Sequence, residues 1–157
     1  MKMSGVLVTP LKRIVDERGD ILHMLRADAP HFQGFGEIYF SEVRPGAVKA
    51  WRKHHEMTIN YAVPIGEVRL VLCDDREGSP FPREIAEVNL GASNYHLVSV
   101  PPGVWYGFKG LGPGVALIAN CATLPHDENE IERADHSEGR FGPIAGIRLR
   151  HLCRDPG

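Results

Sequence analysis

The chain has 157 residues, the length of one domain and enough to bury a sizeable hydrophobic core. Its composition is 43% hydrophobic and 24% charged with a formal net charge of −2, a balance that does not indicate nucleic acid or membrane as a partner. No apolar run is long enough for a signal peptide or a membrane span, and the cysteines form no CxxC pair. We therefore expect a cytoplasmic protein without a disulfide framework or a zinc knuckle.

Short apolar or alternating segments follow one another along most of the chain. The expected strands lie at residues 5–11, 21–25, 37–43, 48–63, 67–75, 84–90, 95–100, 104–111 and 114–122. The 17 glycines and 12 prolines favour tight turns between them. Residues 67–72 and 84–90 alternate between polar and apolar side chains, which is typical of strands with one solvated and one buried face. The sequence therefore predicts a single all-β domain, in which closure into a barrel removes exposed sheet edges.

The last part of the chain differs in character from the strands before it. Residues 125–140 are acidic, and we expect them to form a helical turn or a surface loop. Residues 144–157 could be a strand packed on the barrel or a tail. We place the barrel core at about residues 5–125 and treat residues 126–157 as an acidic loop and C-terminal segment of the same domain.

The first candidate site is the segment Trp51–Glu56, which follows a Pro-Gly turn. In a strand, Arg52 and His54 share one face, whereas His55 and Glu56 straddle the two faces. If that face looks into a barrel, it places a fixed cation beside a group that titrates near neutral pH. This combination suits anionic substrates and proton abstraction. The alternative is a basic edge strand that faces water.

Two further segments are candidates. Residues 100–108 join a Pro-Pro-Gly turn to a dense aromatic run that includes Trp105 and Tyr106; the alternative is a hairpin with packed aromatic rings. Residues 73–80 crowd charges beside Gly-Ser-Pro at a strand end, which indicates a surface turn.

These segments, in this order, resemble the dTDP-4-dehydrorhamnose 3,5-epimerase family over roughly residues 5–125. The matching motifs are Asp16-Glu17-Arg18-Gly19-Asp20, Trp51-Arg52-Lys53-His54, Gly66 to Pro80, and Val100-Pro101-Pro102-Gly103-Val104-Trp105-Tyr106-Gly107-Phe108. The Trp three residues before His looks closer to the epimerase-like paralogues of sugar-biosynthesis clusters than to the rhamnose-pathway enzyme. The resemblance implies a cupin-type double-stranded β-helix (a jelly-roll barrel).

The resemblance also implies a function. Such proteins are homodimers that need no metal or cofactor and act on a nucleoside-diphosphate-linked 4-keto-6-deoxy sugar, where a His removes the proton α to the ketone. Carried over, His54 is the base, with His55 as the alternative because the register is uncertain by one residue. Tyr106 could serve as a substitute acid if its hydroxyl faces the cavity. The substrate-binding candidates are Arg18, Trp51, Arg52, Asn60 and Trp105. The resemblance places Arg52 on the diphosphate and the enolate, and Arg18 on the phosphates as a second ligand, from the same or the other subunit.

The chain departs from the family pattern in several places. The His of the family's H-G-F motif is Tyr106, the position of the usual acidic Tyr falls at Ala119, and no partner for the base can be placed late in the chain. A catalytically degenerate protein that binds a sugar nucleotide therefore stays open as an alternative. A metal-dependent cupin enzyme is the third reading, disfavoured because adjacent histidines point to opposite faces of a strand. Arg83 and Arg133 are expected to be surface residues, suited as controls for substitution of Arg52.

Overall fold

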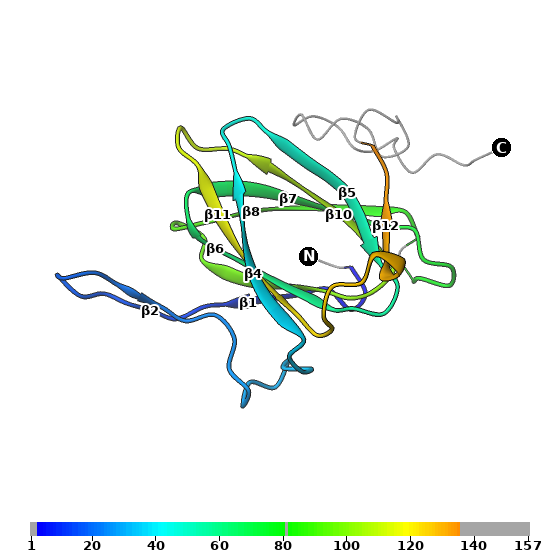
Figure 1. The fold of residues 1–157 in the computed structure, drawn as a ribbon, viewed down its shortest axis with the longest axis horizontal. Coiled ribbons are helices and arrows are strands. Elements are labelled where there is room, and N and C mark those ends of the chain that lie inside the picture. The colour runs from blue at the N-terminus through cyan, green and yellow to red at the C-terminus, as the bar shows by residue number, and fades with distance from the viewer. Residues whose placement is uncertain (1–2, 81, 136–157) are drawn as a thin grey trace.

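The computed structural model describes residues 3–80 and 82–135, and this part of the chain is built from β-strands and one short 3₁₀ helix (Figure 1). The strands are β1 Leu7–Pro10, β2 Arg13–Ile14, β3 Ile21–Leu22, β4 Glu37–Val43, β5 Val48–His54, β6 Ile59–Ile65, β7 Glu67–Asp74, β8 Glu84–Gly91, β9 His96–Val100, β10 Val104–Gly110, β11 Ala116–Ala122 and β12 Ile131–Arg133, and the 3₁₀ helix is η1 Glu128–Glu130. The predicted all-β fold is confirmed. The expected strand or tail at residues 144–157 lies outside the described residues.

Two five-stranded antiparallel sheets make up the barrel. The first sheet has the order β1-β9-β6-β11-β4, and the second has the order β12-β5-β10-β7-β8. Figure 1 shows the two sheets facing each other, with the β2–β3 ribbon extending away from them. This is the predicted jelly-roll arrangement, and it brings β5 and β10 of the second sheet opposite β6 and β11 of the first.

The main hydrophobic core lies between the two sheets and follows from the two-residue period of the strands. Ile59, Tyr61 and Val63 alternate into this core from β6, while Val68 and Leu70 do so from β7. Each is at most 1% exposed. Full burial of an aliphatic side chain of this size stabilises the fold by about 1.5–3 kcal/mol.

The second sheet also has an apolar outer face. Trp51, Val71, Cys73 and Trp105 form a second buried cluster there. The expectation of one solvated face for residues 67–72 is therefore only partly right: Glu67 and Arg69 follow it, but Val71 is 1% exposed because this cluster covers it.

Two sequence segments differ in detail from expectation. Residues 48–63, expected as one strand, form β5 and β6, which belong to different sheets. The acidic segment forms η1 and then β12, which pairs with β5. Within residues 3–80 and 82–135, no helix is long and apolar enough to cross a membrane.

Candidate active site

The centre of the site is a buried imidazole held between a carboxylate and a phenol. His54, the last residue of β5, is 6% exposed. Its Nδ1 lies 2.7 Å from Oε2 of Glu130, and its Nε2 lies 3.0 Å from the hydroxyl of Tyr106 on β10. A carboxylate can only accept, so Nδ1 carries the proton and Nε2 is left as the basic nitrogen that accepts from Tyr106.

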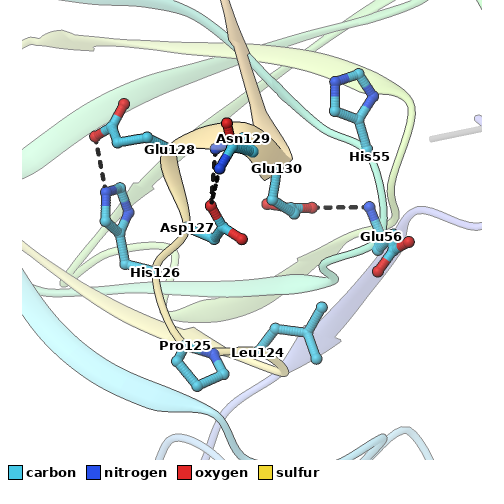
Figure 2. A pocket seen from close by; sticks show the side chains of 9 residues that line it. All are labelled: His55, Glu56, Leu124, Pro125, His126, Asp127, Glu128, Asn129 and Glu130. Carbon is cyan, nitrogen blue, oxygen red and sulfur yellow. Dashed lines mark hydrogen bonds and ion pairs between the residues drawn. The ribbon is translucent and has the colours of Figure 1, made fainter.

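The loop after β11 positions Glu130, as Figure 2 shows. Asp127 caps η1 by accepting from the amide of Asn129 at 2.9 Å. The second carboxylate oxygen of Glu130 accepts from the amides of Glu56 and Met57 at 2.8 and 2.7 Å. The carboxylate is thus fixed by both of its oxygens, and it can orient the imidazole without moving.

The protonation states follow from burial and these hydrogen bonds. Burial lowers the pKa of the His54 imidazole, and the adjacent Glu130 only partly opposes this effect. Burial opposes ionisation of Glu130, but the two amides and His54 outweigh it and lower the pKa of this carboxyl. Burial raises the pKa of Tyr106 to about 12. At neutral pH the site therefore holds a neutral imidazole, a carboxylate and an un-ionised phenol, the states that a general base and its supports need.

A small cavity of about 50 Å³ lies between the two sheets beside this group. It is lined by Tyr39, Ser41, Lys49, Arg52, Tyr61, Tyr106, Phe108, Ile118 and Asn120. Lys49 and Arg52 are three residues apart on β5, and strict alternation would send them to opposite faces. The register of β5 against β10 shifts between Tyr106 and Phe108, and both cations line the same cavity.

The two walls of this cavity come from different sheets. On the first sheet, Asn120 lies between Tyr39 and Tyr61 in the register across β4, β11 and β6. On the second sheet, Arg52 pairs with Tyr106. The Tyr61 ring packs against the Tyr106 ring from the opposite sheet, with the ring centroids 5.3 Å apart. The cavity therefore brings two cations and three phenols together beside the buried His54 imidazole, a set suited to moving a proton next to an anion.

Comparisons with known proteins agree on one class of protein. No protein-family profile matches the chain. It is 32% identical over 127 residues to the probable low-salt glycan biosynthesis epimerase Agl13 of Haloferax volcanii, covering 80% of this chain and 81% of that protein. It is 29% identical to the spore coat polysaccharide biosynthesis protein SpsL of Bacillus subtilis, covering 82% and 85%. The crystal structure of a dTDP sugar isomerase from Desulfovibrio desulfuricans superimposes with a TM-score of 0.85 at 49% identity, covering 87% of both chains.

The chain belongs to the dTDP-4-dehydrorhamnose 3,5-epimerase-like family. The resemblance in its sequence motifs is thereby confirmed, as is its membership of a family of sugar epimerases and isomerases.

The structure of this epimerase-like protein brings His54, Arg52 and Tyr106 together, as the sequence predicted. His55 lies beyond the end of β5 with a half-exposed side chain, 3.9 Å from Glu132. The alternation of strand faces thus distinguishes the two histidines, which the motif left open, and favours His54 as the base.

Trp51 and Trp105 do not join the cavity. Both belong to the cluster on the outer face of the second sheet, because each alternates with a residue that points inward, Arg52 and Tyr106. The indole nitrogen of Trp105 donates to Asp75 at 2.9 Å, and the ammonium of Lys53 lies 4.7 Å from its ring centre. These contacts indicate packing of the epimerase barrel in place of the substrate binding expected from the sequence.

Trp105→Ala is therefore expected to lower the free energy of unfolding by about 3–5 kcal/mol, the usual cost of emptying a buried indole site. Urea denaturation measures this change. The folded fraction of the variant should bind sugar nucleotides like the wild type. Unchanged stability together with lost binding would return Trp105 to a substrate-binding role.

Asn60 on β6 and Ala119 on β11 lie on the face of the first sheet that points away from the cavity. Asn60 donates to the carbonyl of Cys121 at 3.2 Å and accepts from Ser99 at 2.6 Å, so its polar groups are used within the first sheet. Ala119 is flanked by Ile118 and Asn120, which line the cavity. The residue at 119 therefore does not report on whether the cavity contains an acid.

Neither Arg18 nor Arg133 lines the cavity. Arg18 lies in the turn of the β2–β3 ribbon, where its exposed guanidinium binds Asp16. Arg133 is a surface residue whose guanidinium binds Glu128. In the ladder between β12 and β5, however, it lies directly opposite Arg52. Arg133 is therefore next to the site and unsuitable as a distant control.

The residues that sequence reasoning missed are Glu130, Lys49, Tyr39 and Tyr61. A weak indication of Glu130 was available, because it lies in the only strongly acidic stretch late in the chain. Among the described residues, no group of three or more His, Cys, Asp and Glu side chains lies close enough to hold a metal ion.

Proposed function

We propose that this protein is an epimerase or isomerase of a nucleoside-diphosphate-linked 4-keto-6-deoxy sugar, with His54 as the base. The observation that carries this proposal is the Glu130–His54–Tyr106 arrangement beside two cations. The carboxylate fixes the tautomer, so that the basic nitrogen is Nε2, which contacts the cavity-lining residue Tyr106. The similarity to a glycan biosynthesis epimerase and a dTDP sugar isomerase supports the same reaction class.

The chemistry is proton abstraction next to a ketone. His54 Nε2 takes the proton from the carbon α to the C4 carbonyl, and the electron pair moves to the carbonyl oxygen as an enolate. On substrate binding, the Tyr106 hydroxyl exchanges its hydrogen bond with Nε2 for one to this oxygen. Arg52 or Lys49 balances the new negative charge, because a fixed cation in a water-poor cavity stabilises an anion more strongly than water does.

The nucleotide would lie outside the cavity, since about 50 Å³ holds only part of a sugar ring. We assign the diphosphate to the cationic edge of β5 around Arg52, whose guanidinium offers charge and paired donors. The larger pocket in Figure 2 is lined by four carboxylates, from Glu56, Asp127, Glu128 and Glu130, and is a poor diphosphate site.

Arg52→Ala is expected to weaken binding of sugar nucleotides and of free nucleoside diphosphates roughly ten- to a hundredfold, because one charge-assisted contact contributes about 1.5–3 kcal/mol. Isothermal titration calorimetry measures both ligands. Arg26→Ala is the control, because Arg26 is an exposed arginine paired with Asp28. Equal affinities of the two variants would place the diphosphate elsewhere.

The direct test of the function is deuterium exchange. The protein is incubated in heavy water with dTDP-, GDP-, UDP- and CDP-linked 4-keto-6-deoxy sugars, and NMR follows deuterium at C3 and C5. Incorporation with at least one of these substrates supports the proposal. Binding of a sugar nucleotide without any incorporation would instead indicate the catalytically degenerate alternative.

We further propose a cytoplasmic homodimer. Exposed apolar side chains support an association surface on β4 and on the β2–β3 ribbon: Ile38 and Phe40 are 51% and 61% exposed, and Val15 and Ile21 are 80% and 57% exposed. In a dimer, the ribbon could carry Arg18 to the partner's site. Sedimentation analysis tests the assembly.

A further inference from the structure

Inversion of a carbon needs two proton-transfer groups, one on each side of the sugar. A base that removes a proton from one face can return it only to that face, so another group must deliver a proton to the opposite face. On the proposed function, His54 works from the second sheet, together with Arg52 and Tyr106. The second group must therefore come from the first sheet.

The first sheet offers few proton donors to the cavity. Tyr61 is 1% exposed and its ring packs against that of Tyr106, with centroids 5.3 Å apart, so it lies on the base side of the site. Ser41 and Asn120 are bonded to each other at 2.9 Å, and neither is an acid. Tyr39 lines the same cavity from β4 and is 37% exposed to solvent.

We propose that Tyr39 is the acid that delivers the proton to the opposite face of the sugar. Its phenol gives its proton to the enolate carbon while the carbonyl re-forms at C4. The resulting phenolate then takes a proton from solvent, and His54 releases its own proton there. The acidic tyrosine of this protein thus lies on β4, and not on β11, where the sequence motif placed the Ala119 position.

The surroundings of Tyr39 fit this role. Its backbone carbonyl accepts from Asn120 Nδ2 at 3.2 Å, which ties the residue to the centre of the sheet. Burial raises the pKa of the Tyr39 phenol, and Arg52 partly opposes this. The group is therefore protonated at neutral pH, and Arg52 can stabilise the phenolate after proton transfer.

Tyr39→Phe separates the two half-reactions. In heavy water, the variant should still exchange deuterium into recovered substrate through His54, but form inverted product at least tenfold more slowly than the wild type. NMR of the same four sugar nucleotides reads both quantities. Tyr95→Phe is the matched control, because Tyr95 precedes β9 and is not among the residues that line the cavity; it should behave like the wild type.

Three results would overturn the inference or its basis. Inverted product at the wild-type rate would exclude Tyr39 as the acid and leave the proposed function intact. Loss of exchange and inversion together would show that Tyr39 serves binding or proton abstraction instead. Absence of exchange in the wild type itself would contradict the proposed function and not the assignment of Tyr39 alone.

Discussion

His54→Asn is expected to reduce deuterium incorporation into a 4-keto-6-deoxy sugar nucleotide by about 10²–10⁴-fold, the usual contribution of a positioned general base. The amide of Asn keeps polar groups near Glu130 and Tyr106 but cannot accept a proton at neutral pH. Exchange is measured by NMR, and circular dichroism and thermal unfolding check that the variant keeps its fold.

His55→Asn is the matched control for this variant, because His55 is its neighbour in sequence and has a half-exposed side chain. It should exchange deuterium at the wild-type rate. Undiminished exchange by His54→Asn, or its loss in His55→Asn, would move the role of the base away from His54.

Glu130→Gln is expected to lower kcat/KM by up to about 10⁴-fold, the cost of losing the carboxylate that orients a catalytic imidazole in other enzymes. The amide can still hydrogen-bond to Nδ1, but it can present its NH₂ group there and hold the wrong tautomer. It also brings no charge to stabilise the imidazolium that forms when Nε2 takes the proton.

The same variant should change the pH dependence in a defined direction. The neutral imidazole is the active form, so activity falls as the pH drops through the pKa of His54. Burial lowers this pKa, and Glu130 opposes that effect. Without the carboxylate, the pKa falls further, and the acid limb of the kcat/KM profile moves to lower pH.

Glu128→Gln is the control for the charge of the loop, because Glu128 binds His126 and Arg133 but not His54. It should leave the acid limb in place. An acid limb that does not move in Glu130→Gln, or that moves equally in both variants, would contradict a direct effect of Glu130 on the base.

Two adjacent aromatic residues show what the local sequence pattern can and cannot predict. Tyr106 and Trp105 are adjacent in one dense aromatic run, so the sequence pattern makes them equally good candidates for the site. In the structure, Tyr106 touches the base while Trp105 packs on the far side of the sheet. Alternation predicts that adjacent residues of a strand point to opposite faces of the sheet. Only the packing of the second sheet decides which of its two apolar faces lies inside the barrel.

The strands, the turns and the shared face of Arg52 and His54 could be predicted from the sequence alone, because they depend on a two-residue period and on glycine and proline within a few positions. The partner of the base could not. Glu130 is 76 residues from His54 and meets it only because β12 pairs with β5. Tyr39 reaches the cavity from the opposite sheet, and Lys49 shares it with Arg52 where the register of β5 shifts. These placements depend on contacts between distant strands and on an irregularity in the ladder, which tertiary packing decides and short-range periodicity does not encode.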